Sequence, residues 1–312
     1  MELQIQWLKN IRLLLSICIP VYNQDVGLLV TPLLRQIEDR NNQVEIILID
    51  DGSEKYFKDL NSVFSDRVNY IELDRNIGRS KVRNQFLQHS NSQYLLFIDC
   101  DSAIVSKDYI SIYVDYIKEN KPKVLVGASI YDEEFPGLNF RLRWKYGRKR
   151  ESQVVEARRM NPSTSFKTNN FLIARENFKE IQFREELDGY GHEDTLFGYD
   201  LNINNVDIEH IDNPVLNKKL DTNIEFIHKT EHALQNLLKV WKIVDEDQRI
   251  LKQIRIIKFY IKLKNSRLFR SLFFILKRPL KSMLKIGWTN LYAFDLYKLG
   301  YLIQLSSKRD RD

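Results

Sequence analysis

The chain has 312 residues, of which 43% are hydrophobic and 29% charged, a composition that suits a globular protein with a packed core and excludes disordered and fibrous classes. We expect no membrane-spanning segment, because no run approaches the roughly 18 to 20 apolar residues that cross a bilayer. The two cysteines, Cys18 and Cys100, lie in or beside predicted buried strands. This favours reduced thiols and a cytoplasmic setting.

The net charge of +6 is unevenly distributed along the chain. Residues 249–312 hold 16 Lys and Arg against 3 Asp and Glu, a net charge of +13, so the first 248 residues carry −7. A strongly basic segment can bind an anionic membrane surface or a nucleic acid. Because no recognised nucleic-acid-binding module accompanies the charge, we do not expect a nucleic acid as partner.

Strands and helices alternate in the first half of the chain. Short apolar runs predict strands over residues 13–19, 44–49, 68–73 and 94–98, and the segments between them predict helices over 30–39, 55–64 and 79–88. This alternation is typical of βαβ units and a mainly parallel sheet. The first strand is followed neither by G-x-G-x-x-G nor by a Gly-rich basic phosphate loop, which argues against a Rossmann dehydrogenase and a nucleotidyltransferase.

Each predicted strand ends in a polar cluster. In chain order the clusters are Pro20-Val21-Tyr22-Asn23, Asp50-Asp51-Gly52-Ser53, Asp74-Arg75-Asn76-Ile77-Gly78-Arg79 and Asp99-Cys100-Asp101. Because the carboxyl ends of parallel strands meet at one edge of a sheet, all four should line one ligand crevice. Each cluster taken alone is also an ordinary turn or helix cap.

The first three clusters suit a nucleoside diphosphate. Asp51 can accept a hydrogen bond from a pyrimidine N–H, and Tyr22 offers a flat face on which a base can stack. Gly78 allows a diphosphate to approach the start of the following helix, where Arg79 and Arg83 add positive charge.

The fourth cluster suits a divalent cation. Asp99 and Asp101 follow the buried run 94–98, and paired carboxylates are ligands that Mg²⁺ and Mn²⁺ prefer. A single D-x-D is a weak motif, and a solvated strand end explains it equally well.

A second pair of acids, Glu193 and Asp194, opens a predicted helix over 195–204 behind Gly189-Tyr190-Gly191. Acids in a first helical turn are common because they complement the helix dipole. Alternatively, one of them can take the proton of an attacking hydroxyl. Residues 131–168, rich in aromatic and basic side chains, either bind a sugar or phosphate or form a surface loop, and 168–174 predict a strand returning to the sheet.

Taken together, the motifs over about residues 12–245 resemble the family 2 glycosyltransferases with a GT-A fold. The resembling stretches are Ser16-Ile17-Cys18-Ile19-Pro20-Val21-Tyr22-Asn23, Ile49-Asp50-Asp51-Gly52-Ser53, residues 76–84 and Asp99-Cys100-Asp101. The resemblance implies an α/β fold with a mixed, mainly parallel sheet flanked by helices. It also implies inverting transfer of a hexose or N-acetylhexosamine from a UDP-sugar, with Mn²⁺ or Mg²⁺ as cofactor.

By position, the resemblance implies roles for particular residues. The donor contacts would be Pro20, Tyr22, Asn23, Asp51, Asn76, Gly78, Arg79, Arg83 and Asp99, and the metal ligands Asp99 and Asp101.

Residues 189–194 resemble the Gly-aromatic-Gly-x-Glu-Asp segment of galactosyl- and N-acetylgalactosaminyltransferases and of chondroitin-polymerase-like enzymes. This implies that Asp194 is the catalytic base and that Glu193 binds the acceptor, with His192 a further candidate for a substrate contact. Related enzymes often complete the metal site with a histidine where this chain has Asn217. His210 and His228 are candidates for the third ligand, although a single histidine on a strand is more often structural.

We therefore expect a catalytic domain over residues 1–245, with a donor half over about 12–130 and an acceptor half over about 131–245, and a basic helical tail over 246–312. In the tail Ile250, Ile254, Ile257 and Ile261 share one helical face flanked by basic residues, and the apolar pattern continues up to Pro279. This face either lies on an anionic membrane or packs on the main domain.

The expected acceptor is a surface glycan, lipid-linked, and the expected location is the cytoplasm with peripheral attachment to the inner membrane. A catalytically weak or silent scaffold with the same fold, or another transferase that uses nucleotide sugars, remains the alternative.

Overall fold

The computed structural model describes residues 13–38, 43–187, 189–250 and 254–309. Its main sheet has seven strands in the order β3-β2-β1-β4-β8-β6-β9. In chain order these are β1 (Leu15–Val21), β2 (Val44–Asp50), β3 (Asn69–Glu72), β4 (Tyr94–Ile98), β6 (Val124–Val126), β8 (Asn170–Ala174) and β9 (Ile208–His210). Strand β8 is antiparallel to both β4 and β6, and the other neighbouring pairs are parallel. The predicted α/β class with a mainly parallel sheet is confirmed.

Strand β1 is longer at its carboxyl end than the apolar run suggests, because it continues through Pro20 to Val21. Its pairing with β4 covers Leu15–Cys18, whereas its pairing with β2 runs on to Val21. At Pro20 the strand therefore lies beyond its β4 pairing, and a proline without an N–H is tolerated in such an edge position.

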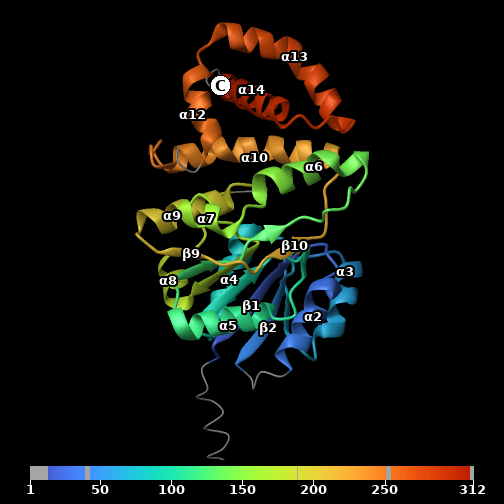
Figure 1. The fold of residues 1–312 in the computed structure, drawn as a ribbon, viewed down its shortest axis with the longest axis vertical. Helices are drawn as coiled ribbons and strands as arrows, with labels where there is room; N and C mark the ends of the chain where they lie inside the picture. The colour runs from blue at the N-terminus through green and yellow to red at the C-terminus, as the bar shows by residue number, and fades with distance from the viewer. Residues whose placement is uncertain (1–12, 39–42, 188, 251–253, 310–312) are drawn as a thin grey trace, which may run out of the picture.

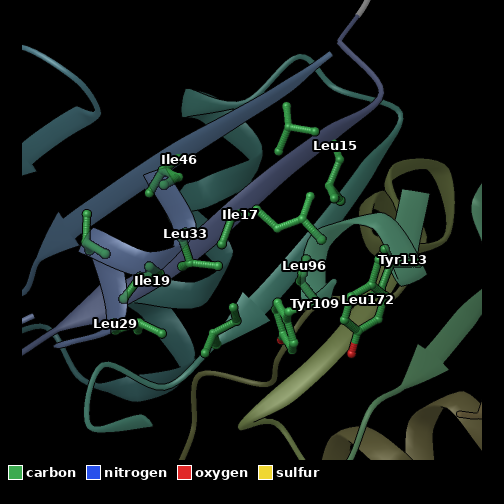
Figure 2. Packing of buried hydrophobic residues seen from close by; sticks show 14 of the residues in the cluster. Leu15, Ile17, Ile19, Leu29, Leu33, Ile46, Leu96, Tyr109, Tyr113 and Leu172 are labelled. Carbon is green, nitrogen blue, oxygen red and sulfur yellow. The ribbon is translucent and has the colours of Figure 1, made fainter. Parts of the chain in front are cut away.

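Two hydrophobic clusters fill the two faces of this sheet. Helices α2 (Gly27–Ile37) and α5 (Tyr109–Asn120) contribute Leu29, Leu33, Tyr109 and Tyr113 to the cluster on one face (Figure 2). Helices α4 (Arg79–His89), α8 (Arg175–Glu180) and α9 (Glu193–Ile203) pack on the other cluster. Both Cys18 and Cys100 are free thiols, as expected.

A small second sheet lies beside the end of β4. It has the order β5-β10-β7, with β5 (Ser102–Ile104), β10 (Val215–Asn217) and β7 (Ser129–Ile130). Asn217 is in register with Ser102, and the N–H of Lys218 donates to the carbonyl of Asp101 at 3.3 Å. The chain around position 217 therefore lies next to the Asp99-Cys100-Asp101 turn, although the two are more than a hundred residues apart in sequence.

The remaining elements connect or cover these sheets. They are α3 (Lys55–Asn61), η1 (Ser62–Phe64), η2 (Leu138–Phe140), α6 (Arg141–Tyr146), η3 (Gly147–Glu151), α7 (Val155–Met160) and the C-terminal helices α10 (Asn223–Ile243), α12 (Arg255–Leu263), α13 (Arg267–Lys285) and α14 (Leu291–Arg309). Helices α12, α13 and α14 lie together at one end of the molecule, beyond α10 (Figure 1).

The C-terminal helices pack on the rest of the chain. One cluster joins Leu196 and Tyr199 of α9 to α10, α12 and α14, and a second joins Leu142 of α6 to α10, α13 and α14. The isoleucines at 250, 254 and 257 are buried in the first cluster, so this face packs on the protein. Helix α13 runs through Pro279, up to which the apolar pattern of the sequence extends, and ends at Lys285. Among the described residues, no helix is long and apolar enough to cross a membrane.

Candidate active site

Asp51 anchors the loop between β3 and α4. Its two carboxylate oxygens accept hydrogen bonds from the backbone N–H groups of Ile77 at 2.6 Å and Gly78 at 3.1 Å. Burial raises the pKa of Asp51, and these two hydrogen bonds oppose the rise. The predicted nucleoside contact is therefore also the residue that fixes the Asn76-Ile77-Gly78 turn.

Tyr22 and Asn23 follow β1 in a turn held to the second polar cluster. The Asn23 N–H donates to Ser53 Oγ at 2.8 Å, and Asn23 Oδ1 accepts from the Glu54 N–H at 2.8 Å. Asn23 has φ 47°, a left-handed conformation that asparagine tolerates better than most residues. Tyr22 is 51% exposed, so its ring is available for stacking.

Arg83 is buried against Asp99. Its guanidinium Nη2 donates to Asp99 Oδ1 at 2.8 Å, and its side chain is 2% exposed. A guanidinium held in this way orients Asp99. Arg83 therefore positions Asp99, and its direct contact with a diphosphate stays a prediction.

The chemistry of the β4 carboxyl end fits a divalent cation. Burial and the neighbouring charge of Asp99 raise the pKa of Asp101, which is the behaviour of two carboxylates that share too little positive charge. Among the described residues, no group of three or more His, Cys, Asp or Glu side chains is arranged to hold a metal. Mg²⁺ is often held by one or two carboxylates plus substrate phosphates and water, so Asp99 and Asp101 suffice for such a site.

Neither candidate histidine joins these carboxylates. His210 Nδ1 is 3.0 Å from Arg158 Nη1, and Nε2 is 3.0 Å from the Pro162 carbonyl, so both ring nitrogens are engaged. Burial lowers the pKa of His210 to about 4, which keeps the ring neutral. His228 Nδ1 faces Glu231 at 3.8 Å. We therefore withdraw His210 as a metal ligand and assign it a structural role.

Asp194 sits in the first turn of α9 and pairs with Lys167. Lys167 Nζ donates to Asp194 Oδ2 at 3.0 Å, and the Thr195 N–H donates to Oδ1 at 2.7 Å. Burial acts to raise the pKa of Asp194, but Lys167, His192 and these hydrogen bonds outweigh it. The net result is a pKa lowered to about 2. Asp194 is therefore ionised at neutral pH, as a proton acceptor must be. Burial also lowers the pKa of His192, the residue before this turn.

Arg79 connects the loop between β3 and α4 to the start of α9. It is the first residue of α4, and its Nη1 donates to Glu193 Oε1 at 3.2 Å. Its guanidinium carbon also lies 4.8 Å from the ring centroid of Tyr190. Glu193 and Tyr190 both belong to the Gly-Tyr-Gly-x-Glu-Asp segment, so the third polar cluster and this segment meet at Arg79.

Sequence reasoning missed two features of the site. Lys167 lies just before β8 and belongs to no recognisable sequence motif. Only the fold brings it to Asp194. Within residues 131–168, Arg143 Nη1 donates to Glu151 Oε2 at 2.8 Å, and Tyr131 hydrogen-bonds to the same carboxylate. The segment is therefore held by a partly buried ion pair rather than forming a simple surface loop.

The fold is that of the GT-A glycosyltransferases. It resembles S. aureus TarS 1–349, with a TM-score of 0.53 and 18% identity over 96% of this chain and 92% of that chain. It also resembles the mannosyltransferase PcManGT from Pyrobaculum calidifontis, with a TM-score of 0.59 and 14% identity over 97% and 91% of the two chains. At these identities the likeness concerns the fold alone.

Residues 16–181, more than half of the chain, match the family model described as glycosyl transferase family 2. The chain therefore belongs to glycosyl transferase family 2, which confirms the family and the transferase class expected from the sequence. It is also similar to the glycosyltransferase GlyA of Streptococcus pneumoniae serotype 4, with 30% identity over 127 residues. That match covers 40% of this chain and 18% of the relative's length.

Proposed function

We propose that this protein is an inverting, metal-dependent glycosyltransferase that moves a hexose or N-acetylhexosamine from a UDP-sugar to a surface glycan. The proposal rests above all on the contact between Arg79 and Glu193. That contact joins the Asn76-Ile77-Gly78 turn, which Asp51 holds, to Glu193 and Asp194 at the start of α9. A catalytically silent scaffold has no need for such a junction between two sets of polar loops.

Several observations support a UDP-sugar as donor. The exposed ring of Tyr22 can stack on a base, and the glycine turn at Gly78 opens the N-terminus of α4 to a diphosphate. The solved TarS structures include complexes with UDP and with UDP-GlcNAc. PcManGT was solved with a different nucleotide sugar, GDP-Man, and with Mn²⁺, which supports the cation rather than the uridine.

We propose a single-step displacement in which the acids of α9 act on the acceptor. The acceptor hydroxyl oxygen attacks the anomeric carbon from the face opposite the diphosphate, and Asp194 takes the hydroxyl proton. The new C–O bond forms as the bond to the diphosphate breaks, which inverts the anomeric configuration. Glu193 accepts a hydrogen bond from the acceptor and orients it. Asp99 and Asp101 would hold a divalent cation, which would supply positive charge for the leaving diphosphate.

A donor panel tests this proposal. UDP release is measured with Mn²⁺ for UDP-Gal, UDP-GalNAc, UDP-Glc and UDP-GlcNAc, using the wild type, Asp101→Ala and the control Asp207→Asn, whose side chain is 81% exposed. We expect release from one donor, lost on addition of a chelator and in Asp101→Ala, and unchanged in the control. Metal-independent release contradicts the cation site, and UDP binding without any release indicates a scaffold.

We also propose that the protein attaches to an anionic membrane through α13, where a lipid-linked acceptor is found. The outer face of this helix exposes Leu268 (81%), Leu272 (52%) and Ile275 (70%), spaced as one helical stripe. Arg267 and Arg270 are exposed on the same helix, within a segment of net charge +13. Apolar side chains flanked by cations suit the boundary between anionic headgroups and acyl chains.

Flotation with liposomes separates the membrane proposal from the catalytic one. The full-length wild type should float with vesicles containing phosphatidylglycerol and less with pure phosphatidylcholine. The double variant Leu272→Glu/Ile275→Glu should stay at the bottom of the gradient. Leu28→Glu, a change at a 69% exposed position on α2, is the matched control and should float normally. Equal flotation of the wild type and the double variant contradicts attachment through α13.

A further inference from the structure

We propose that Arg79 makes the acceptor side of the site respond to the donor. Its guanidinium pairs with Glu193. An incoming donor diphosphate attracts the same guanidinium and weakens that ion pair, which frees Glu193 to accept a hydrogen bond from an acceptor hydroxyl. The inference rests on the proposed function of this site and adds a linkage between donor binding and acceptor binding.

The geometry gives Arg79 access to both sides. It belongs to α4, whose N-terminus has Gly78 as its cap with φ 93° and no side-chain cap hydrogen bond. From there its Nη1 reaches Glu193 Oε1 at 3.2 Å, while the ring of Tyr190 lies against the guanidinium at 4.8 Å. The Arg79 side chain is 48% exposed, so it can be approached from the crevice, whereas Glu193 is 9% exposed.

The surrounding charges define what competes for Arg79. Glu193 and Asp99 both act to raise the pKa of Arg79, and Arg79 in turn acts to lower the pKa of Asp101. The guanidinium therefore lies among the carboxylates of both sides of the site. A diphosphate carries more negative charge than one carboxylate and also accepts from the free N–H groups of the first turn of α4, so it competes well for Arg79.

Separating the pair has a cost on the acceptor side. A carboxylate as buried as Glu193 is destabilised when its counter-ion leaves, because little water reaches it. Hydroxyl groups of an acceptor can supply the missing hydrogen bonds. Donor and acceptor binding are then linked through one charge, and such a linkage acts equally in both directions.

The linkage predicts that Glu193 weakens donor binding in the absence of acceptor. The isosteric variant Glu193→Gln removes the competing charge, so UDP should bind more tightly. A partly exposed ion pair is worth up to about 1 kcal/mol, which corresponds to roughly a fivefold change in Kd. Uridine, which lacks phosphate, should bind equally to both proteins.

Titration calorimetry of UDP in the presence of Mn²⁺ tests this on the full chain. The set is the wild type, Glu193→Gln, Arg79→Gln and the double variant, with Glu133→Gln as control because its side chain is 93% exposed. Glu193→Asp is a second variant, in which the shorter arm should give an intermediate gain. We expect tighter UDP binding in Glu193→Gln, no further effect of that change when Arg79 is absent, and wild-type affinity in the control.

The outcomes separate this inference from the proposed function. If Glu193→Gln binds UDP as tightly as the wild type, or less tightly, the inference alone is overturned. Glu193 then does not compete with the donor for Arg79. The same holds if Glu193→Gln tightens UDP binding equally with and without Arg79. Failure of the wild type to bind UDP overturns both the inference and the proposed function.

Discussion

The pair formed by Lys167 and Asp194 should couple measurably in folding. Lys167→Met removes the ammonium group but keeps most of the side-chain length, and Asp194→Asn removes the carboxylate charge. The Lys167 Nζ to Asp194 Oδ2 distance of 3.0 Å allows a charge-assisted hydrogen bond. Its contribution to the free energy of unfolding is the coupling energy of a double-mutant cycle.

The expected coupling energy follows from the pKa of Asp194 and the exposure of Lys167. The fall in the pKa of Asp194 from 3.8 to about 2 corresponds to roughly 2 kcal/mol in all, and Lys167 supplies the largest of the contributions that lower it, ahead of His192 and the Thr195 N–H. Lys167 is 49% exposed, however, so solvent screening reduces the coupling energy to about 1 kcal/mol. Because the folded pKa lies below the unfolded one, this stabilisation is present above about pH 4 and is lost as pH falls toward 2.

Urea unfolding at pH 7 and pH 3.5 measures the cycle. Lys123 and Asp207 give a matched control cycle, since they lie 3.6 Å apart with side chains 50% and 81% exposed and should couple negligibly. A coupling energy near zero for Lys167 and Asp194 at pH 7 would refute the reasoning, as would a coupling energy that is larger at pH 3.5.

Four further outcomes follow from the fold. Gly52→Ala should lower the free energy of unfolding by about 2 to 3 kcal/mol, because φ is 72° and a Cβ would lie 2.4 Å from the Arg75 carbonyl carbon. Gly78→Ala, with φ 93° but no atom within 4 Å of the added Cβ, should cost only about 1 kcal/mol in the same urea titration. His210→Ala should destabilise the protein yet leave Mn²⁺-dependent UDP binding unchanged, which calorimetry checks against the metal-ligand hypothesis. Tyr297→Phe should lower the thermal midpoint by a few degrees, because Tyr297 OH hydrogen-bonds to the buried carboxylate of Glu231.

Local pattern was sufficient for most of the donor half. The run 94–98 is β4 exactly as its apolar residues indicate, and the helix expected from residue 79 begins there as α4. Both depend on periodicity and on a flanking turn, which are properties of neighbouring residues. The convergence of Asp51 with the 76–78 turn was also predictable, because parallel strands present their carboxyl ends at one edge.

Local pattern failed where a side chain's partner is distant in sequence. His210 fits a metal-ligand pattern equally well whether or not Arg158 and Pro162 occupy its nitrogens, and only folding brings those groups to it. Helix α13 passes through Pro279 because tertiary packing on α10 and α14 outweighs the helix-breaking tendency of proline.

In the basic tail, too, the sequence pattern predicts one property and tertiary contacts decide another. Its amphipathic character was evident from the sequence, but periodicity does not tell which partner covers an apolar face. The structure buries Ile254 and Ile257 against α9, α10 and α14 and leaves the stripe of Leu268, Leu272 and Ile275 open. The tail therefore packs on the domain with one face and exposes another.

The sequence by itself determined the fold class and the family and singled out the candidate acids, because these depend on residue type, spacing and strand order. The tertiary structure decided how those acids are paired: Asp99 with Arg83, Glu193 with Arg79 and Asp194 with Lys167. The physical reason is that the electrostatic interaction of two side chains depends on their separation in space and on their exposure to water, neither of which the spacing of residues along the chain defines.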